Sequence, residues 1–462
     1  MLFPTLAFGL FFVAVYVLNW LTRPHPLVWR VTILGASLFF YAWWNWRFVF
    51  LLMWAVVSNW YAGTQIERSL RSDNTQGARN WLLTAIVGDL LILGVFKYYD
   101  FFALELSNLL GANTTLPLLE LTLPVGISFF TFQAMSYVID LKRDLVKPMP
   151  FLDFAVYLSF FPQLVAGPIV RASEMAPQIT HRPDPRRVQS AEAFHLILRG
   201  LFKKVVISSW LASNLVDGVF ANPDDYSGHD VLLGIYGYAI QIYADFSGYT
   251  DIAIGVALLL GFRFPTNFDC PYRALSLRDF WKRWHITLSS WLRDYLYIPL
   301  GGNRGRNVET CRNLLITMIL GGLWHGSTWN FVIWGLIHGV ALVVERLLPT
   351  GNLHPVLRWF VTFHVICFAW VFFRAESFSN ALDVLTAVVA FSGDDQVSSL
   401  PVLLLILVAV GTQFISKART EQFSRWRDQH SALTQGVMFG IGLVLIDLFG
   451  PEGVAPFIYF QF

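Results

Sequence analysis

One histidine in this chain lies where ionisable side chains are rare. No Asp, Glu, Lys or Arg occurs from Asn313 through Val344, yet His325 lies inside this stretch. A titratable group at bilayer depth is costly and usually marks a site or a pathway. A neutral imidazole accepts the proton of a hydroxyl nucleophile well, because its ordinary pKa of about 6.5 lies near working pH. The alternative is a buried histidine that is hydrogen-bonded to a neighbouring helix and has no chemical role.

The second histidine, His285, lies in a polar and aromatic segment that precedes this apolar stretch. The spacing predicts a helix over 278–296, with an apolar stripe of Trp281, Trp284, His285, Leu288 and Leu292. We expect this helix to be amphipathic and to lie at the cytoplasmic membrane interface. The arrangement predicts that both histidines reach one buried chamber. Acyl transfer from a thioester to an alcohol needs such a base, a dry channel and a donor for the oxyanion.

Residues close to His325 fit the wall of such a chamber. Trp324 and Trp329 are candidate channel walls, and Asn330 is a candidate donor to a developing oxyanion. His338 is expected to point to a different helix face and to be structural.

A second polar group interrupts an earlier apolar run. Asp245 and Ser247 are expected to line a cavity, and Asp251 to be a helix cap or the partner of an arginine. A structural role is the alternative to a functional one for each of these side chains.

Composition places the whole chain in a membrane. It has 462 residues, of which 55% are hydrophobic and 14% charged, whereas soluble domains have about 25% charged residues. Long apolar runs without strand alternation predict an all-α polytopic protein, organised as a single transmembrane domain over 1–462 with about 9–12 spans. Segment 151–165 is expected to be broken or re-entrant. The three cysteines are scattered, so neither a metal site nor a disulfide framework is predicted.

Loop charge predicts the orientation. Lys and Arg exceed Asp and Glu in 171–204 and in the motif segment 263–313, which predicts that both face the cytoplasm. The acidic segment 217–230 and the N-terminus are then expected outside. The net charge of +2 gives no reason to expect a nucleic-acid partner.

The same residues carry a resemblance to a known family. The sequences ADFSGYTDIAIG (244–255), DFWKRWH (279–285), WLRDYLYIPLGGNR (291–304) and GLWHGSTWN (322–330) resemble motifs of the membrane-bound O-acyltransferase family. Within it, the chain is most similar to the bacterial alginate O-acetyltransferase branch, which VAGPI (165–169) and PFIYFQF (456–462) also fit.

The resemblance implies a ring of transmembrane helices around a central funnel or tunnel, with re-entrant and interfacial helices. It implies that His325 is the catalytic histidine and His285 the second motif histidine. Substrate contacts are expected from the motif residues Arg283, Trp284 and Tyr297. No cofactor is expected to be bound permanently; acetyl-coenzyme A is the expected donor substrate.

The resemblance also implies a location and partners. We expect a multi-pass protein of the bacterial inner membrane, surrounded by lipid, which passes acetyl groups outward to an alginate-like exopolysaccharide. A periplasmic acetyltransferase and an exopolysaccharide synthesis and secretion complex are the expected protein partners. Alternatives are O-acetylation of peptidoglycan or cellulose, D-alanyl transfer to teichoic acid, a polymer or proton-coupled transporter, and a scaffold subunit.

Overall fold

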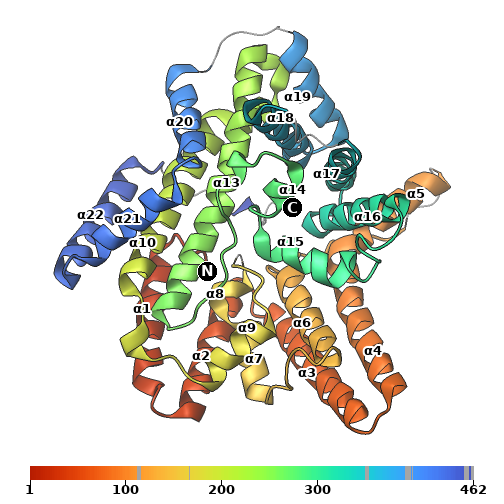
Figure 1. Cartoon of the computed structure of the whole chain (residues 1–462), viewed down its shortest axis with the longest axis vertical. Helices are drawn as coiled ribbons and strands as arrows, with labels where there is room; N and C mark the ends of the chain where they lie inside the picture. The colour runs from red at the N-terminus through yellow and green to blue at the C-terminus, as the bar shows by residue number, and fades with distance from the viewer. Residues whose placement is uncertain are drawn as a thin grey trace. The chain divides into compact units, whose positions relative to one another are not determined.

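The computed structural model describes residues 1–111, 116–165, 167–348, 353–390, 397, 399–451 and 457–458. Every regular element within these residues is a helix, which confirms the predicted all-α class (Figure 1). Ala166 of the VAGPI element, and all of PFIYFQF except Phe457 and Ile458, lie outside the described residues.

The helices group into two compact units. Unit 1 comprises Met1–Ala193 and Ile252–Pro265, and unit 2 comprises Phe194–Asp251 and Thr266–Phe462. The prediction of a single domain stays a prediction. The helices of unit 1 are α1 (Leu6–Thr22), α2 (Pro26–Ala42), α3 (Phe48–Arg71), α4 (Thr75–Leu93), α5 (Tyr99–Leu110), α6 (Ile127–Lys142), α7 (Phe151–Ser159), α8 (Phe161–Leu164) and α9 (Ala172–Thr180).

Unit 2 holds the remaining helices, although the first turn of α10 and the last turns of α13 belong to unit 1. They are α10 (Ser190–Leu201), α11 (Ser209–Leu211), α12 (Asp217–Ala221), α13 (Gly228–Leu259), α14 (Leu277–Trp281), α15 (Ile286–Leu292), α16 (Asn307–His325), α17 (Trp329–Leu347), α18 (Pro355–Arg374), α19 (Phe378–Ala390), α20 (Ser399–Thr412), α21 (Lys417–Asp428) and α22 (Ala432–Phe449). The wider π-helical turns η3 (Phe202–Ser208) and η4 (Ala212–Val216) connect α10, α11 and α12, and a third, η7 (Arg293–Tyr297), follows α15.

Five helical stretches in the described residues are long and apolar enough to cross a membrane. They are Thr75–Leu110, Gly228–Leu259, Trp329–Leu347, Pro355–Arg374 and Ala432–Phe449. A sixth is obtained if Leu400–Thr412 and Lys417–Asp428, which are bent by 88° at their junction, form one span. The helices α1, α2 and α19 are apolar but shorter. The larger number of 9–12 spans stays a prediction.

Segment 151–165 is broken, as predicted. Helix α7 ends at Ser159, Phe160 adopts a non-helical conformation, and α8 begins at Phe161 with Pro162 in its first turn. The freed backbone is satisfied inside unit 1, because the Phe161 amide donates to the Ser37 hydroxyl at 3.2 Å. Irregular backbone at membrane depth is tolerated only under such cover.

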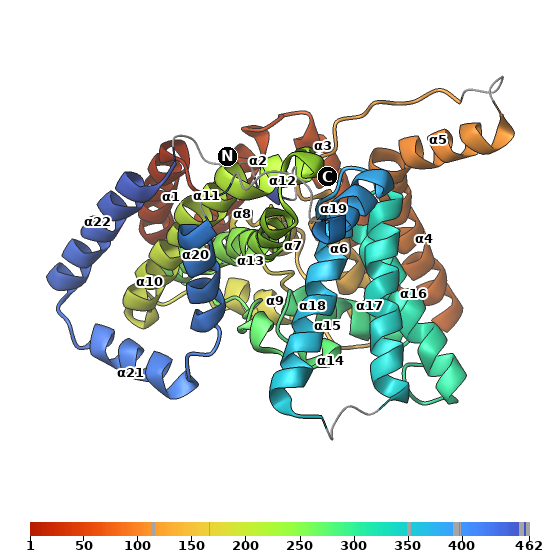
Figure 2. The ribbon, with the colours of Figure 1, turned by 90° about the horizontal axis from the view of Figure 1, so that it is seen from above.

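The apolar stretch from Asn313 through Val344 forms a hairpin of two helices. The short connection Gly326–Thr328 separates α16 from α17, and Figure 2 shows α16, α17 and α18 side by side in unit 2. The two helices approach closely because Gly322 faces the Phe331 carbonyl and Gly335 faces the Met318 carbonyl. A Cβ on Gly322 would lie 2.1 Å from that oxygen, so the close packing requires glycine.

Candidate active site

His285 lies at a sharp turn, so the predicted continuous helix over 278–296 is wrong. Helix α14 ends at Trp281, and α15 begins after His285, which adopts the left-handed conformation with φ 41° and ψ 55°. Hydrogen bonds to a distant segment replace those of a helix. The Ile286 amide donates to the Asn267 carbonyl at 2.9 Å, and the Asp269 amide donates to the Arg283 carbonyl at 3.0 Å. The spacing of apolar residues could not reveal this pairing, because Asn267 lies outside 278–296, the stretch from which the helix was predicted.

Asn267 fixes the orientation of the His285 ring. Its Oδ1 accepts hydrogen bonds from the Thr287 amide at 3.1 Å and the Thr287 hydroxyl at 2.8 Å, and it lies 3.2 Å from His285 Nδ1. Two donors on Oδ1 establish that it is the acceptor, so Nδ1 of His285 carries the hydrogen. The other ring nitrogen, Nε2, is then the basic one.

Aromatic rings enclose His285. Its ring centroid lies 4.6 Å from that of Phe246 and 6.0 Å from that of Trp324. The residue is fully buried, and burial lowers the pKa of His285 from 6.5 to about 3. The imidazole is therefore neutral at ordinary pH.

His325 is the last residue of α16 and lies in a second aromatic enclosure. Its ring is 5.0 Å from Trp324, 4.9 Å from Trp334 and 5.2 Å from Phe373, all in edge-to-face geometry. Only 4% of the residue is exposed. The preceding helix directs the negative end of its dipole toward this position, which favours positive charge there.

Trp324 connects the two histidines. Its indole contacts both imidazole rings, and only 3% of it is exposed. The two residues that the sequence singled out from separate segments therefore share one buried neighbour. A neutral imidazole and a second imidazole at a helix C-terminus, both shielded from water, suit proton transfer to and from a hydroxyl or thiol.

Comparison with known proteins identifies the family. The sequence model of the membrane-bound O-acyltransferase family matches residues 30–373, a stretch that contains both histidines. This chain belongs to that family. The acyltransferase is 42% identical to the probable alginate O-acetylase AlgI of Pseudomonas aeruginosa, over 83% of this chain and 74% of that protein. It is 38% identical to a peptidoglycan O-acetyltransferase of Helicobacter pylori, over 83% of this chain and 77% of that protein.

A more distant relative transfers a different group. The acyltransferase is 28% identical to a teichoic acid D-alanyltransferase of Streptococcus thermophilus, over 54% of this chain and 68% of that protein.

The other residues expected around His325 differ in their burial. Asn330 is buried, and its amide nitrogen donates to the Ala375 carbonyl at 2.8 Å. Trp329 is 53% exposed. Trp334 and Phe373, which contact the His325 ring, were not singled out from the sequence. Their helical spacing resembles that of ordinary core aromatics, so no local signal distinguishes them.

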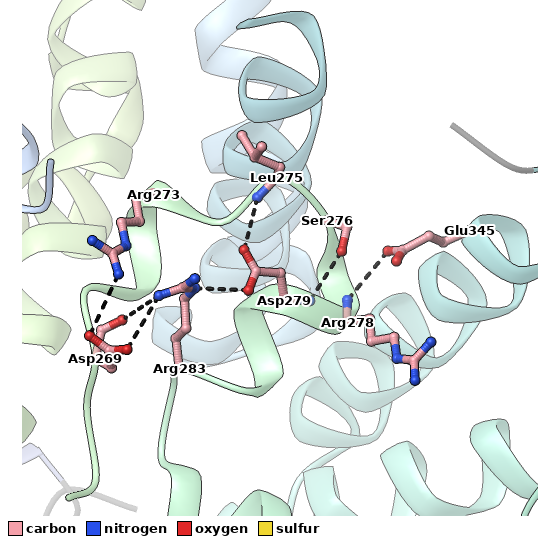
Figure 3. A network of polar contacts seen from close by, with 8 residues as sticks. All are labelled: Asp269, Arg273, Leu275, Ser276, Arg278, Asp279, Arg283 and Glu345. Carbon is pink, nitrogen blue, oxygen red and sulfur yellow. Dashed lines mark hydrogen bonds and ion pairs between the residues drawn. The ribbon is translucent and has the colours of Figure 1, made fainter. Parts of the chain in front are cut away.

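The motif arginine is engaged by the protein's own carboxylates (Figure 3). Arg283 Nε lies 2.9 Å from Asp279 Oδ1, and Arg283 Nη1 lies 3.4 Å from Asp269 Oδ2. Trp284 packs against Phe268 and Trp370 in the core of unit 2. These contacts give both residues a framework role around the His285 turn, whether or not they also touch substrate.

Tyr297 closes the π-helical turn η7 at the other end of the motif segment. The residue is partly exposed, and burial raises the pKa of its phenol. Its carbonyl accepts a hydrogen bond from the Gly302 amide at 2.9 Å. The backbone of Tyr297 is therefore fixed at the start of the turn that contains Gly301 and Gly302.

The carboxylates of α13 are buried and form ion pairs inside unit 2. Asp245 pairs with Lys204 and accepts from the Ile458 amide at 2.8 Å. Asp251 pairs with Arg199 at 2.6 Å and with Lys203 at 2.8 Å, which confirms the predicted arginine partner. Ser247 is also buried, and its hydroxyl has no hydrogen-bond partner among the described residues. Sequence reasoning missed Lys204, because a lysine in a basic stretch is normally explained by loop orientation.

Proposed function

We propose that this acyltransferase takes an acetyl group from a cytoplasmic thioester, acetyl-coenzyme A, and transfers it across the inner membrane for O-acetylation of an extracytoplasmic polysaccharide. The observation that carries the proposal is the pair of buried histidines that share Trp324 within a family of O-acyltransferases. The names of the relatives support the acetyl group and a polymer acceptor. Alginate or a similar exopolysaccharide is the proposed polymer.

His325 is the proposed general base. It takes the proton of the acceptor hydroxyl as the oxygen attacks the thioester carbonyl carbon. The C–S bond then breaks, and the leaving thiolate takes the proton back from the imidazolium, so that an ester and a thiol result. The C-terminus of α16 stabilises the positive charge that His325 carries between these two proton transfers. The aromatic enclosure keeps water from competing as the nucleophile.

His285 is proposed to act as a hydrogen-bond acceptor rather than as a general base that becomes protonated. Its Nδ1 is committed to Asn267, and its low pKa keeps Nε2 unprotonated. A neutral acceptor at this position would orient the hydroxyl or thiol that exchanges its proton with His325.

Exposed cations of the motif segment support a donor that carries phosphates. Lys282 and Arg304 are exposed, and neither forms an ion pair within the described residues. Such side chains bind phosphates well. Arg283 contributes less to this argument, because Asp279 and Asp269 already neutralise it.

The acetyl group is proposed to leave the protein on the far side through a periplasmic acetyltransferase, within an exopolysaccharide synthesis and secretion complex. Peptidoglycan is a second acceptor that a relative supports. D-alanyl transfer is supported by a relative of lower identity and coverage.

Replacement of His325 tests the proposal. With labelled acetyl-coenzyme A and proteoliposomes that contain the full chain, we expect His325→Ala to lower acetyl transfer by about 10²- to 10⁴-fold. The matched control is His181→Ala, since His181 is exposed and lies in α9's C-cap. Unchanged transfer by His325→Ala at equal protein level would overturn the enzymatic role of this residue. Transport of polymer or protons without any acetyl transfer by the unmodified protein would favour a transporter.

A further inference from the structure

A largely apolar groove lies between α17 and α18, inside unit 2. Its volume is about 550 Å³, within the range of about 300–1,000 Å³ that is typical of ligand pockets. Its walls are branched and aromatic side chains, with Leu336, Val340 and Val344 from α17 and Val361, Val365 and Phe368 from α18. Several of these side chains are about half exposed, so the groove is open along its length. A membrane protein offers such a surface to lipid.

The length of the groove matches one leaflet. It extends from Leu336 to Glu345 along α17 and from Phe368 to Arg358 along the antiparallel α18. At 1.5 Å per residue these stretches span about 14–15 Å. Half of a bilayer's hydrocarbon core is about 15 Å thick. An acyl chain that enters at the Glu345–Arg358 end therefore matches the groove in length.

The charged end of the groove carries a guanidinium group, that of Arg358. Arg358 lines the groove, its Nε is buried, and neither a hydrogen bond nor an ion pair to its guanidinium occurs in the part of the chain that the structure describes. A buried guanidinium nitrogen without a partner is costly, and phosphate satisfies it well.

Glu345 does not serve as that partner. Its Oε2 accepts from the Leu277 amide at 2.7 Å and from the Arg278 amide at 3.3 Å, and Figure 3 draws the second of these contacts. These are the first amides of α14, whose positive end favours a carboxylate. Figure 3 also shows the Arg278 guanidinium directed away from the contacts of Glu345 and Asp279. This side chain is exposed, which adds positive potential near the groove's end.

We propose that the groove is a binding site for a membrane glycerophospholipid, with one acyl chain between α17 and α18 and the phosphate on Arg358. The bound lipid would also contact Leu275 and Leu277, which lead into α14 and toward the His285 turn. The site is independent of the acyl-transfer chemistry, because neither histidine lines it.

Lipid retention tests this site in the full-length protein. After delipidation in detergent, phosphatidylglycerol is titrated and binding is followed by native mass spectrometry. We expect one saturable site, weakened at least tenfold by Arg358→Gln, which removes the charge, and by Ala341→Phe, which fills the groove. The matched control is Arg346→Gln, since Arg346 lies at the same end of α17 but contacts Asn307 rather than the groove.

Three outcomes would overturn the proposal. Equal weakening by Arg346→Gln would show general attraction to a charged surface. Unchanged binding by Ala341→Phe, in protein with unaltered thermal unfolding, would place the lipid elsewhere. The third outcome is that no lipid binds, but a transmembrane helix of a partner protein is retained and is lost in Ala341→Phe. That result would show that a protein segment, and not a lipid, occupies the groove.

Discussion

Asn267 Oδ1 lies 3.2 Å from His285 Nδ1, and the same oxygen accepts two hydrogen bonds from Thr287. The amide therefore determines which nitrogen of the buried imidazole is basic. This relationship joins a residue that precedes the motif segment's helices to the turn on which His285 lies, and it makes Asn267 a positioning residue for the proposed chemistry.

Replacement of Asn267 should reduce catalysis without unfolding the protein. We expect Asn267→Ala to lower kcat for acetyl transfer by about 10- to 100-fold, because an unanchored His285 populates both tautomers and more than one ring orientation. The acid limb of the pH–rate profile should also shift, and KM for the donor should change little. Thr287→Ser keeps the hydroxyl donor and serves as the control. A proportional loss of folded protein, with normal kcat per folded molecule, would leave Asn267 only a structural role.

Acid should destabilise the protein partly through His285. The folded-state pKa of about 3 lies below the unfolded value of about 6.5, so the unfolded chain binds a proton that the folded chain excludes. The contribution of His285 to the free energy of unfolding is complete above about pH 6.5 and is lost as pH falls toward about 3. The free energy of unfolding then decreases by up to about 1.4 kcal/mol for each pH unit. Thermal unfolding in detergent should therefore depend less on pH between 6.5 and 4 for His285→Gln. An identical pH dependence in both proteins would show that His285 is not excluded from protonation.

The α16–α17 hairpin should not tolerate a methyl group on Gly322. The added Cβ would lie 2.1 Å from the Phe331 carbonyl oxygen, so the backbones of the two helices must separate. Overpacking of this kind costs about 1–3 kcal/mol. Gly436→Ala in α22 is the control, since no atom lies within 4 Å of its added Cβ. Equal melting temperatures for the two variants would contradict the close helix approach.

The buried pair Lys204–Asp245 should respond differently to single and double replacement. Both side chains are at most 2% exposed. Lys204→Met leaves a buried carboxylate without its cation, which should cost about 3–5 kcal/mol, and Lys204→Met with Asp245→Leu should recover most of it. Arg71→Gln is the comparison, because the exposed pair with Glu67 should contribute only about 0–1 kcal/mol. Additive losses in the double variant would show that the two side chains act independently.

Sequence patterns predicted the apolar helices well, because lipid and core both demand uninterrupted apolar runs. The expected all-α class is confirmed, and the element at 151–165 is broken, as expected. The predicted helix over 278–296 was wrong because backbone hydrogen bonds in this segment go to residues outside it. Helical spacing alone gave no sign that Asn267 and Asp269 would interrupt the helix at Lys282–His285.

The candidate site was predicted in part. His325 was identified from its apolar surroundings and His285 from the apolar stripe of its segment, and their shared neighbour Trp324 was among the expected wall residues. Trp334 and Phe373 could not be selected, because an aromatic residue in an apolar helix has no distinctive local pattern. The family resemblance implied that Arg283 contacts substrate, and nothing in the sequence pattern showed that Asp279 and Asp269 would pair with it.

The ion pairs of α13 have a consequence for how the protein enters the membrane. Asp245 and Asp251 lie in a helix that qualifies as a span, and a carboxylate near the middle of an inserting helix costs about 3 kcal/mol. Their cations, Arg199, Lys203 and Lys204, come from the preceding helical segment, which the ribosome delivers first. We therefore expect the insertion machinery to hold 194–217 until α13 arrives, and to release the two segments into lipid as an already neutralised pair.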